Sequence, residues 1–216
     1  EQEILVIAGG FSYGDDVAAG RVWGLELRHN LAEALKRYVE RGGLALGVCN
    51  GFQVLVESGL FDSTGPDGQR DIALTNNESN HYECRWVTLR SEECACPWIE
   101  AGELMPTPVA HAEGRFVVKS DETLARLRKN RQIALTYVTP DGGKASYPAN
   151  PNGAVADIAG ICDPTGRVLG LMPHPERNLD PWNHPQWTRL SADRTQGEGL
   201  PFYERMVASA AAGVSV

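Results

Sequence analysis

The sequence lacks the features that mark membrane and nucleic-acid-binding proteins. No hydrophobic run approaches the roughly 18 residues that a membrane-spanning helix needs, and no signal-peptide pattern precedes the apolar run at residues 4–8. Positive charge is in deficit, since 20 Lys and Arg against 28 Asp and Glu give a net charge of −8. This acidic balance argues against a general nucleic-acid surface. We therefore expect a cytoplasmic protein that has neither a membrane nor a nucleic acid as its partner.

The cysteines are few and odd in number. The five cysteines are scattered, at positions 49, 84, 94, 96 and 162, so the disulfide framework of a secreted protein is not expected. Cys94 and Cys96 lack a second pair at zinc-site spacing, and we predict no metal site. The glycine-containing loop at residues 9–15 is neither a Walker loop nor a Gly-x-Gly-x-x-Gly turn. It is either a plain strand-to-helix connection or a loop that offers backbone N–H groups to an anion.

One cysteine stands in a distinctive pattern. An apolar run at residues 44–48 predicts a buried parallel strand, and a helix is predicted from Asn50 to a C-terminal glycine, Gly59. Between them, Gly47 and Gly51 flank Cys49 at two residues on each side, which is the nucleophile-elbow pattern with cysteine in place of serine. A helix N-terminus also favours a thiolate. The alternative is a buried structural cysteine.

The order of the predicted elements indicates an α/β protein. Apolar runs alternate with helical periodicity, and we predict a doubly wound, mostly parallel sheet with flanking helices in one domain over residues 1–216. The expected strands lie at residues 4–8, 44–48, 72–75, 86–89, 116–118, 132–138, 155–162 and 167–172, the last two forming a hairpin. The expected helices lie at residues 22–41, 50–58, 120–130 and 200–211.

A second chemical group follows the hairpin. Pro173 and Pro175 flank His174 and are expected to keep the backbone extended, so that His174 and Glu176 point the same way. A carboxylate in that position orients an imidazole and stabilises its cationic form. The alternative is an ordinary surface histidine. The polar stretch at residues 76–85 is either a solvated hairpin or a surface that meets a ligand. His111 and Glu113 alternate onto one face of an extended segment, and we interpret them as a solvent-facing pair.

Several runs together resemble the class I glutamine amidotransferases, and more closely the glutaminase subunits of phosphoribosylformylglycinamidine synthase. The elbow run Gly-Val-Cys-Asn-Gly-Phe-Gln and Met-Pro-His-Pro-Glu-Arg indicate the class, and Gly-Gly-Phe-Ser-Tyr-Gly-Asp with Asn-Pro-Asn-Gly indicates the member. The matching runs lie at residues 9–15, 47–53, 82–86, 110–116, 147–153 and 172–177.

The resemblance implies a role for each matching residue. Cys49 would attack the carboxamide of L-glutamine, with His174 as general base and acid and Glu176 as its orienting carboxylate. Backbone N–H groups of Gly10 and Asn50 would form the oxyanion hole. Gln53, on the first turn of the helix, would help to hold the substrate, and no metal is implied.

The resemblance also implies a partner protein, and it shows one place where this sequence differs from the family. The family passes ammonia to a synthetase that uses ATP and Mg²⁺ to make formylglycinamidine ribonucleotide, and a small bridging subunit is a further expected component. We expect no cofactor in this chain itself. The family begins with a βα unit ahead of Ile4 that this sequence does not show, so we expect the first βα unit to be lacking and the sheet to carry an unpaired edge.

Other interpretations remain open. The chain is alternatively a non-catalytic, glutaminase-like docking module, or another class I amidotransferase. A cysteine-elbow protein of the ThiJ/PfpI type shares the predicted sheet and reactive cysteine, but is not expected to carry Pro-His-Pro-Glu near its C-terminus. A glutaminase assay with the synthetase partner separates the enzyme from the docking module.

Overall fold

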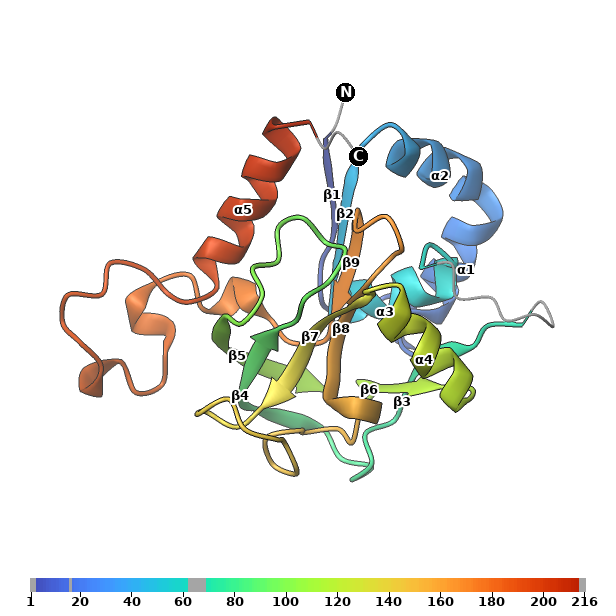
Figure 1. The fold of residues 1–216 in the computed structure, drawn as a ribbon. Helices are drawn as coiled ribbons and strands as arrows, with labels where there is room; N and C mark the ends of the chain where they lie inside the picture. Colours follow the sequence, from blue (N-terminus) through green and yellow to red (C-terminus); the bar gives the residue numbers. More distant parts are fainter. Residues whose placement is uncertain (1–2, 16, 62–68, 214–216) are drawn as a thin grey trace.

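The computed structural model describes residues 3–15, 17–61 and 69–213. One long sheet runs through the centre, with α5 on one side of it and α1 to α3 on the other (Figure 1). A fourth helix, α4, packs beside a second, two-stranded sheet. The helices are α1 (Arg21–Glu26), α2 (Ala32–Glu40), α3 (Asn50–Ser58), α4 (Asp121–Lys129) and α5 (Leu200–Ala211).

The central sheet is mixed. Its strands are β1 (Ile4–Ile7), β2 (Leu44–Val48), β4 (Glu83–Ser91), β5 (Leu104–His111), β7 (Ile133–Val138), β8 (Ile158–Cys162) and β9 (Val168–Leu171). Within the described residues their order is β1-β2-β9-β8-β7-β4-β5. The three strands β1, β2 and β9 are parallel, and every other neighbouring pair is antiparallel.

The predicted α/β class and the flanking helices are therefore confirmed, and the parallel part of the sheet is the part that carries the elbow. The β8–β9 hairpin is also as predicted, although its first strand begins at Ile158 because residues 155–157 form a 3-10 turn. The remaining strands make the sheet mixed because each returns antiparallel to its neighbour. Of the described strands, β1 and β5 stand at the two edges.

The helix predicted at residues 22–41 is not continuous. A π-helical turn, Leu27–Leu31, separates α1 from α2, and the backbone of Leu31 departs from helical angles at φ −127° and ψ 3°. The first part packs closely on α3, where a Cβ at Gly24 would overlap the Cβ of Glu57. Regular spacing of Leu27, Leu31 and later apolar residues predicts helix but does not reveal such an interruption.

Strand β5 was missed by the sequence-based prediction. It contains Pro106 and Pro108, which lack the N–H that a central strand donates to both neighbours. Among the described strands β5 is an edge strand that pairs only with β4, with Pro108 opposite Trp86. Prolines are tolerated at an edge because their missing N–H faces away from the ladder.

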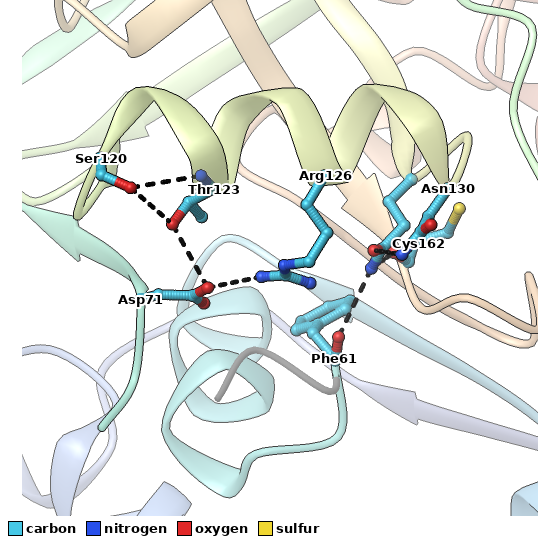
Figure 2. A network of polar contacts seen from close by, with 8 residues as sticks. Phe61, Asp71, Ser120, Thr123, Arg126, Asn130 and Cys162 are labelled. Carbon is cyan, nitrogen blue, oxygen red and sulfur yellow. Dashed lines mark hydrogen bonds and ion pairs between the residues drawn. The ribbon is translucent and has the colours of Figure 1, made fainter. Parts of the chain in front are cut away.

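The second sheet and α4 form a small layer of their own. Strands β3 (Ile72–Thr75) and β6 (Arg115–Val118) pair antiparallel. The sequence offers Ser120 or Asp121 as the cap of this helix, and in the structure Ser120 caps α4 by accepting a hydrogen bond from the Thr123 N–H at 3.3 Å. Figure 2 shows that Asp71 then ties α4 to β3: its Oδ2 lies 2.6 Å from Arg126 Nη2 and accepts from Thr123 Oγ1 at 3.3 Å.

Candidate active site

Three parallel strands end at one place, and this brings the predicted site residues together. Cys49 directly follows β2, and its N–H donates to the Leu171 carbonyl at the end of β9, at 2.8 Å. His174 follows β9 by three residues, and Gly10 follows β1 by three. Because carboxyl ends of neighbouring parallel strands meet at the same edge, residues 125 apart in sequence share one site.

The elbow has the tight geometry that its glycines predict. Cys49 adopts φ 52° and ψ −108°, a conformation that is strained for a side-chain-bearing residue. A Cβ at Gly47 would lie 2.5 Å from the carbonyl oxygen of Gly51, and a Cβ at Gly51 would overlap the carbonyl oxygen of Ile7. The strand, the turn and α3 can approach this closely only because neither glycine has a side chain.

The Cys49 thiol is buried and protonated in this resting pocket. Burial raises the pKa of Cys49 to about 11, and the nearby Glu176 and Asp15 carboxylates act in the same direction. The Asn50 N–H at the start of α3 and the Arg177 guanidinium lower this pKa, but by less. The helix N-terminus thus favours the thiolate, as expected, but desolvation by burial outweighs this effect. The Sγ lies 3.8 Å from the carbonyl oxygen of Ala110, to which it donates.

His174 and Glu176 form the predicted pair. His174 Nδ1 lies 2.6 Å from Glu176 Oε1, and the imidazole is almost fully buried. The backbone that brings the two side chains together is not the predicted extended one. Residues Pro175–Arg177 form a 3-10 turn, in which the Arg177 N–H donates to the His174 carbonyl at 3.1 Å. The turn, rather than strand alternation, places the carboxylate beside the ring. From α5, Tyr203 Oη donates to Glu176 Oε2 at 3.5 Å.

The proline-containing strand positions this histidine. The His174 N–H donates to the Pro108 carbonyl at 2.9 Å, and Asn178 Nδ2 donates to the Pro106 carbonyl at 2.8 Å. On the other side, a Cβ at Gly9 would lie 2.9 Å from His174 Cε1 and 3.4 Å from Cys49 Cβ. Imidazole and cysteine therefore pack against the same glycine.

His174 Nε2 is left available by this arrangement. It is buried and has no hydrogen-bond partner among the described residues. Since Nδ1 donates to the carboxylate, Nε2 of the neutral ring is an acceptor. A buried acceptor of this kind beside a thiol is what a general base requires.

A cavity of about 150 Å³ opens at the elbow. Its walls come from the loop after β1, the elbow, the end of β5 and the turn after β9. The lining residues are Gly10, Phe11, Asp15, Ala19, Cys49, Gln53, Tyr82, Ala110, His111, Ala112, Glu113, His174 and Arg177.

Of the predicted site residues, Cys49, His174, Gln53 and Gly10 line the cavity. Gly10 has φ 137°, and within the described part of the chain no atom outside its immediate neighbours lies within 4 Å of the position of a Cβ there. Asn50 is buried behind them, and its Nδ2 donates to Gln53 Oε1 at 3.1 Å. Gln53 Nε2 in turn donates to the Glu113 carbonyl. The two amides thus fix the start of α3 against the end of β5.

His111 and Glu113 are not the solvent-facing pair that the sequence suggested. His111 is 3% exposed, and both residues line the cavity. Asn77, from the polar stretch at residues 76–85, holds the histidine, and Glu113 Oε2 accepts from the Ala19 N–H at 3.2 Å. From the stretch at residues 76–85, Tyr82 also lines the cavity, so this stretch is not merely a solvated hairpin.

Sequence reasoning gave no role to Asp15, Tyr82 and Arg177, which also line the cavity. All three lie inside runs that carried the family resemblance, which was the available signal. Among the described residues, no group of three or more His, Cys, Asp or Glu side chains is arranged to hold a metal ion. None of the described helices is long and apolar enough to cross a membrane.

Comparison with known proteins agrees with this geometry. A family model described as a CobB/CobQ-like glutamine amidotransferase domain matches residues 1–208. The phosphoribosylformylglycinamidine synthase subunit PurQ of Methanococcus maripaludis (strain C7) is 43% identical over 205 residues, which cover 93% of this chain and 75% of the relative. The subunit of the same name from Dehalococcoides mccartyi is 41% identical over 210 residues, 96% of this chain and 79% of the relative.

A solved structure resembles the chain as well. It is described as the structure of PurLQS from Thermotoga maritima; the matched chain is 31% identical, with a TM-score of 0.68, and the match covers 95% of this chain and 79% of that one. Together these matches define the class as that of the CobB/CobQ-like glutamine amidotransferase domains. Within that class, the chain belongs to the family of PurQ subunits of phosphoribosylformylglycinamidine synthase.

Proposed function

We propose that this chain hydrolyses L-glutamine to glutamate and ammonia, and that the ammonia is delivered to a synthetase that makes formylglycinamidine ribonucleotide in purine biosynthesis. Cys49 is the nucleophile, His174 the general base and acid, and Glu176 the carboxylate that orients the imidazole. The observation that carries the proposal is the meeting of an elbow cysteine and a carboxylate-bound histidine against Gly9. Family membership supplies the reaction.

Acylation begins with proton transfer. His174 Nε2 takes the thiol proton as Cys49 Sγ attacks the carboxamide carbon, and the carbonyl oxygen becomes an oxyanion. Backbone N–H groups of Gly10 and Asn50 are proposed to bind that oxyanion, and one such donor typically lowers the barrier by about 2.7–4 kcal/mol. His174 then returns the proton to the amide nitrogen, ammonia leaves, and a γ-glutamyl thioester remains on Cys49.

Deacylation runs through the same groups. His174 takes a proton from water as the water oxygen attacks the thioester carbon, and the second oxyanion occupies the same hole. Collapse of this intermediate breaks the C–S bond, and the proton returns to Cys49. Glu176 stabilises the imidazolium in both halves, because its carboxylate lies at Nδ1 throughout.

The charges of the cavity suit a zwitterionic amino acid. Asp15 and Glu113 supply carboxylates for the α-ammonium group, and Arg177 supplies a guanidinium for the α-carboxylate. Gln53, fixed by Asn50 and the Glu113 carbonyl, forms the floor of the cavity. We propose that these residues hold the α-carbon end of glutamine while its carboxamide reaches Cys49.

The partner is proposed to supply the rest of the reaction. This chain needs no cofactor for thioester chemistry, and ATP and Mg²⁺ belong to the synthetase. A small bridging subunit is a further proposed component, and the cytoplasm is the proposed location. The protonated resting thiol fits control by the partner, since an enzyme that releases ammonia only when docked avoids wasting glutamine.

The test is covalent labelling of the 216-residue chain mixed with its synthetase partner. We expect 6-diazo-5-oxo-norleucine, a glutamine-like electrophile, to leave one adduct, on Cys49, that excess glutamine suppresses. Cys49→Ala removes both the adduct and ammonia release, whereas Cys84→Ala, which changes an exposed cysteine outside the cavity, leaves both intact. Labelling spread over all cysteines, or ammonia release by Cys49→Ala, contradicts the proposal and favours the docking module.

A further inference from the structure

The cavity contains a second buried imidazole that the proposed mechanism does not use. His111 ends β5 and lines the cavity together with Cys49 and His174. Its Nε2 is buried and has no hydrogen-bond partner among the described residues. A buried polar nitrogen without a partner costs stability, so a ligand that supplies the missing hydrogen bond would offset that cost.

Asn77 fixes which nitrogen of His111 carries the proton. Asn77 Nδ2 donates to the carbonyls of His81 and His111, at 2.9 and 2.8 Å. Its Oδ1 therefore faces the Gly114 N–H, at 3.1 Å, and His111 Nδ1, at 3.0 Å. Because Oδ1 can only accept, Nδ1 must carry the proton, and Nε2 is a bare acceptor.

The ring can neither turn nor readily become charged. A Cβ at Gly114 would lie 2.5 Å from His111 Cε1, so the ring packs directly on this glycine. Burial, together with the nearby His174, lowers the pKa of His111 to about 4. At neutral pH His111 is therefore an uncharged group that accepts but does not donate at Nε2.

This acceptor lies close to the proposed reacting atoms. The thiol of Cys49 donates to the carbonyl of Ala110, the residue before His111. His174 is also near enough to lower the pKa of His111. A carboxamide at Cys49 whose oxygen lies in the proposed oxyanion hole must direct its NH₂ group to another wall of the cavity. His174 and His111 are the imidazoles of the cavity lining, and His174 Nε2 is the nitrogen proposed to take the thiol proton.

We propose that His111 Nε2 accepts a hydrogen bond from the carboxamide NH₂ of bound glutamine, and that it selects glutamine against its product glutamate. The proposal rests on the proposed glutaminase function and adds a residue that determines specificity. An NH₂ group donates to the bare nitrogen. A carboxylate oxygen in the same place brings lone pairs against a lone pair and loses its water without compensation. The same site thus binds substrate and expels product.

Two substitutions separate this role from a general effect on packing. In His111→Asn the shorter side chain no longer reaches the position of Nε2. In His111→Gln the amide does reach it, and it can rotate to present either its oxygen or its NH₂ group. Both are assayed in the complex with the synthetase, with melting temperature as the control for folding, by KM and kcat for glutamine and the inhibition constant for glutamate.

We expect His111→Asn to lower kcat/KM for glutamine about tenfold, as for one lost hydrogen bond in a closed site. His111→Gln should retain kcat/KM within about threefold, yet bind glutamate about tenfold more tightly, because its NH₂ group can donate to the carboxylate. If both variants keep the wild-type preference for glutamine over glutamate, the inference is overturned. If the wild-type complex itself releases no ammonia, the proposed function fails instead.

A measurement without substitution at position 111 covers the case in which both variants unfold. In the Cys49→Ala chain bound to the synthetase, ¹⁵N-labelled imidazole resonances report the hydrogen bonding of each histidine nitrogen. We expect glutamine to shift the bare Nε2 resonance of His111 towards that of a hydrogen-bonded nitrogen, and glutamate to leave it in place. Equal shifts with the two ligands, or none with glutamine, overturn the inference.

Discussion

Gly51 lies so close to Ile7 that a Cβ on the glycine would overlap the Ile7 carbonyl oxygen. The first turn of α3 therefore rests directly on the end of β1, and this contact sets the position of the elbow between the two strands. The glycine is required by space and not by backbone angle, since Gly51 does not have a positive φ. Its substitution should thus affect the fold before it affects the chemistry.

The first prediction is that Gly51→Ala destabilises the chain by at least about 3 kcal/mol, because backbone must move to admit the methyl group. Urea unfolding followed by circular dichroism measures this. Gly59→Ala, at the other end of α3, is the control. Its φ is 83°, and none of the described residues places an atom within 4 Å of the Cβ position, so only about 1 kcal/mol of backbone strain is expected. Equal losses in the two variants contradict the packing argument.

The second prediction concerns the contact between α4 and β3. Asp71 is buried, and Arg126→Met removes its ion-pair partner at 2.6 Å while the apolar part of the side chain is kept (Figure 2). The expected loss is about 1–3 kcal/mol, the cost of a buried acceptor left with fewer partners, reduced because Arg126 is partly exposed. Arg128→Met, an exposed arginine on the same helix, should change the unfolding free energy by less than about 0.5 kcal/mol.

None of these α4 residues lines the active cavity. Glutamine hydrolysis at a temperature where the Arg126→Met chain is folded should therefore equal that of the wild type. A loss of stability in the Arg128→Met variant as large as that in Arg126→Met would show that charge removal, and not the Asp71 contact, is responsible.

The third prediction concerns the carboxylate beside His174. Glu176→Gln keeps the size of the side chain but removes the charge that stabilises the imidazolium, and its amide can stabilise the wrong tautomer. We expect kcat for glutamine to fall about 100- to 10,000-fold, with little change in melting temperature because Glu176 is 40% exposed. Tyr203→Phe removes only the 3.5 Å hydrogen bond to the other carboxylate oxygen, and a fall of less than about fivefold is expected. A wild-type kcat for Glu176→Gln would remove this residue from the triad.

The sequence predicts best what is encoded locally. The spacing of Gly47, Cys49 and Gly51 implies the elbow, and Ser120 and Asp121 imply a cap at the start of α4, because each feature depends on residues within a few positions. The pairing of His174 with Glu176 was also predicted, although the 3-10 turn that produces it was not. An extended backbone and a 3-10 turn can each bring side chains two residues apart together, so spacing alone does not determine the backbone.

What the sequence does not reveal depends on distant partners. His111 looks like a surface residue until Asn77, 34 positions earlier, closes over it. Strand β5 looks like a loop because its prolines are acceptable only at the edge of a sheet, and edge position is a property of the whole sheet. The walls of the cavity likewise depend on the parallel order of β1, β2 and β9. The hydrophobic periodicity of the sequence does not determine that order.

The last prediction concerns the charge state of Cys49. With a pKa of about 11, about one thiol in a thousand is ionised at pH 8, and the thiolate fraction rises about tenfold per pH unit until the pKa is reached. Alkylation of Cys49 by iodoacetamide in the free chain should therefore accelerate steadily up to about pH 10, with the exposed Cys84 in the same sample as an internal control. Peptide-resolved mass spectrometry measures both rates. Docking of the synthetase is expected to speed Cys49 alkylation at pH 8 while leaving Cys84 unchanged, because Cys49 lines the cavity and Cys84 does not. A Cys49 rate in the free chain that already reaches its plateau near pH 7 would show a stable thiolate and contradict control by desolvation.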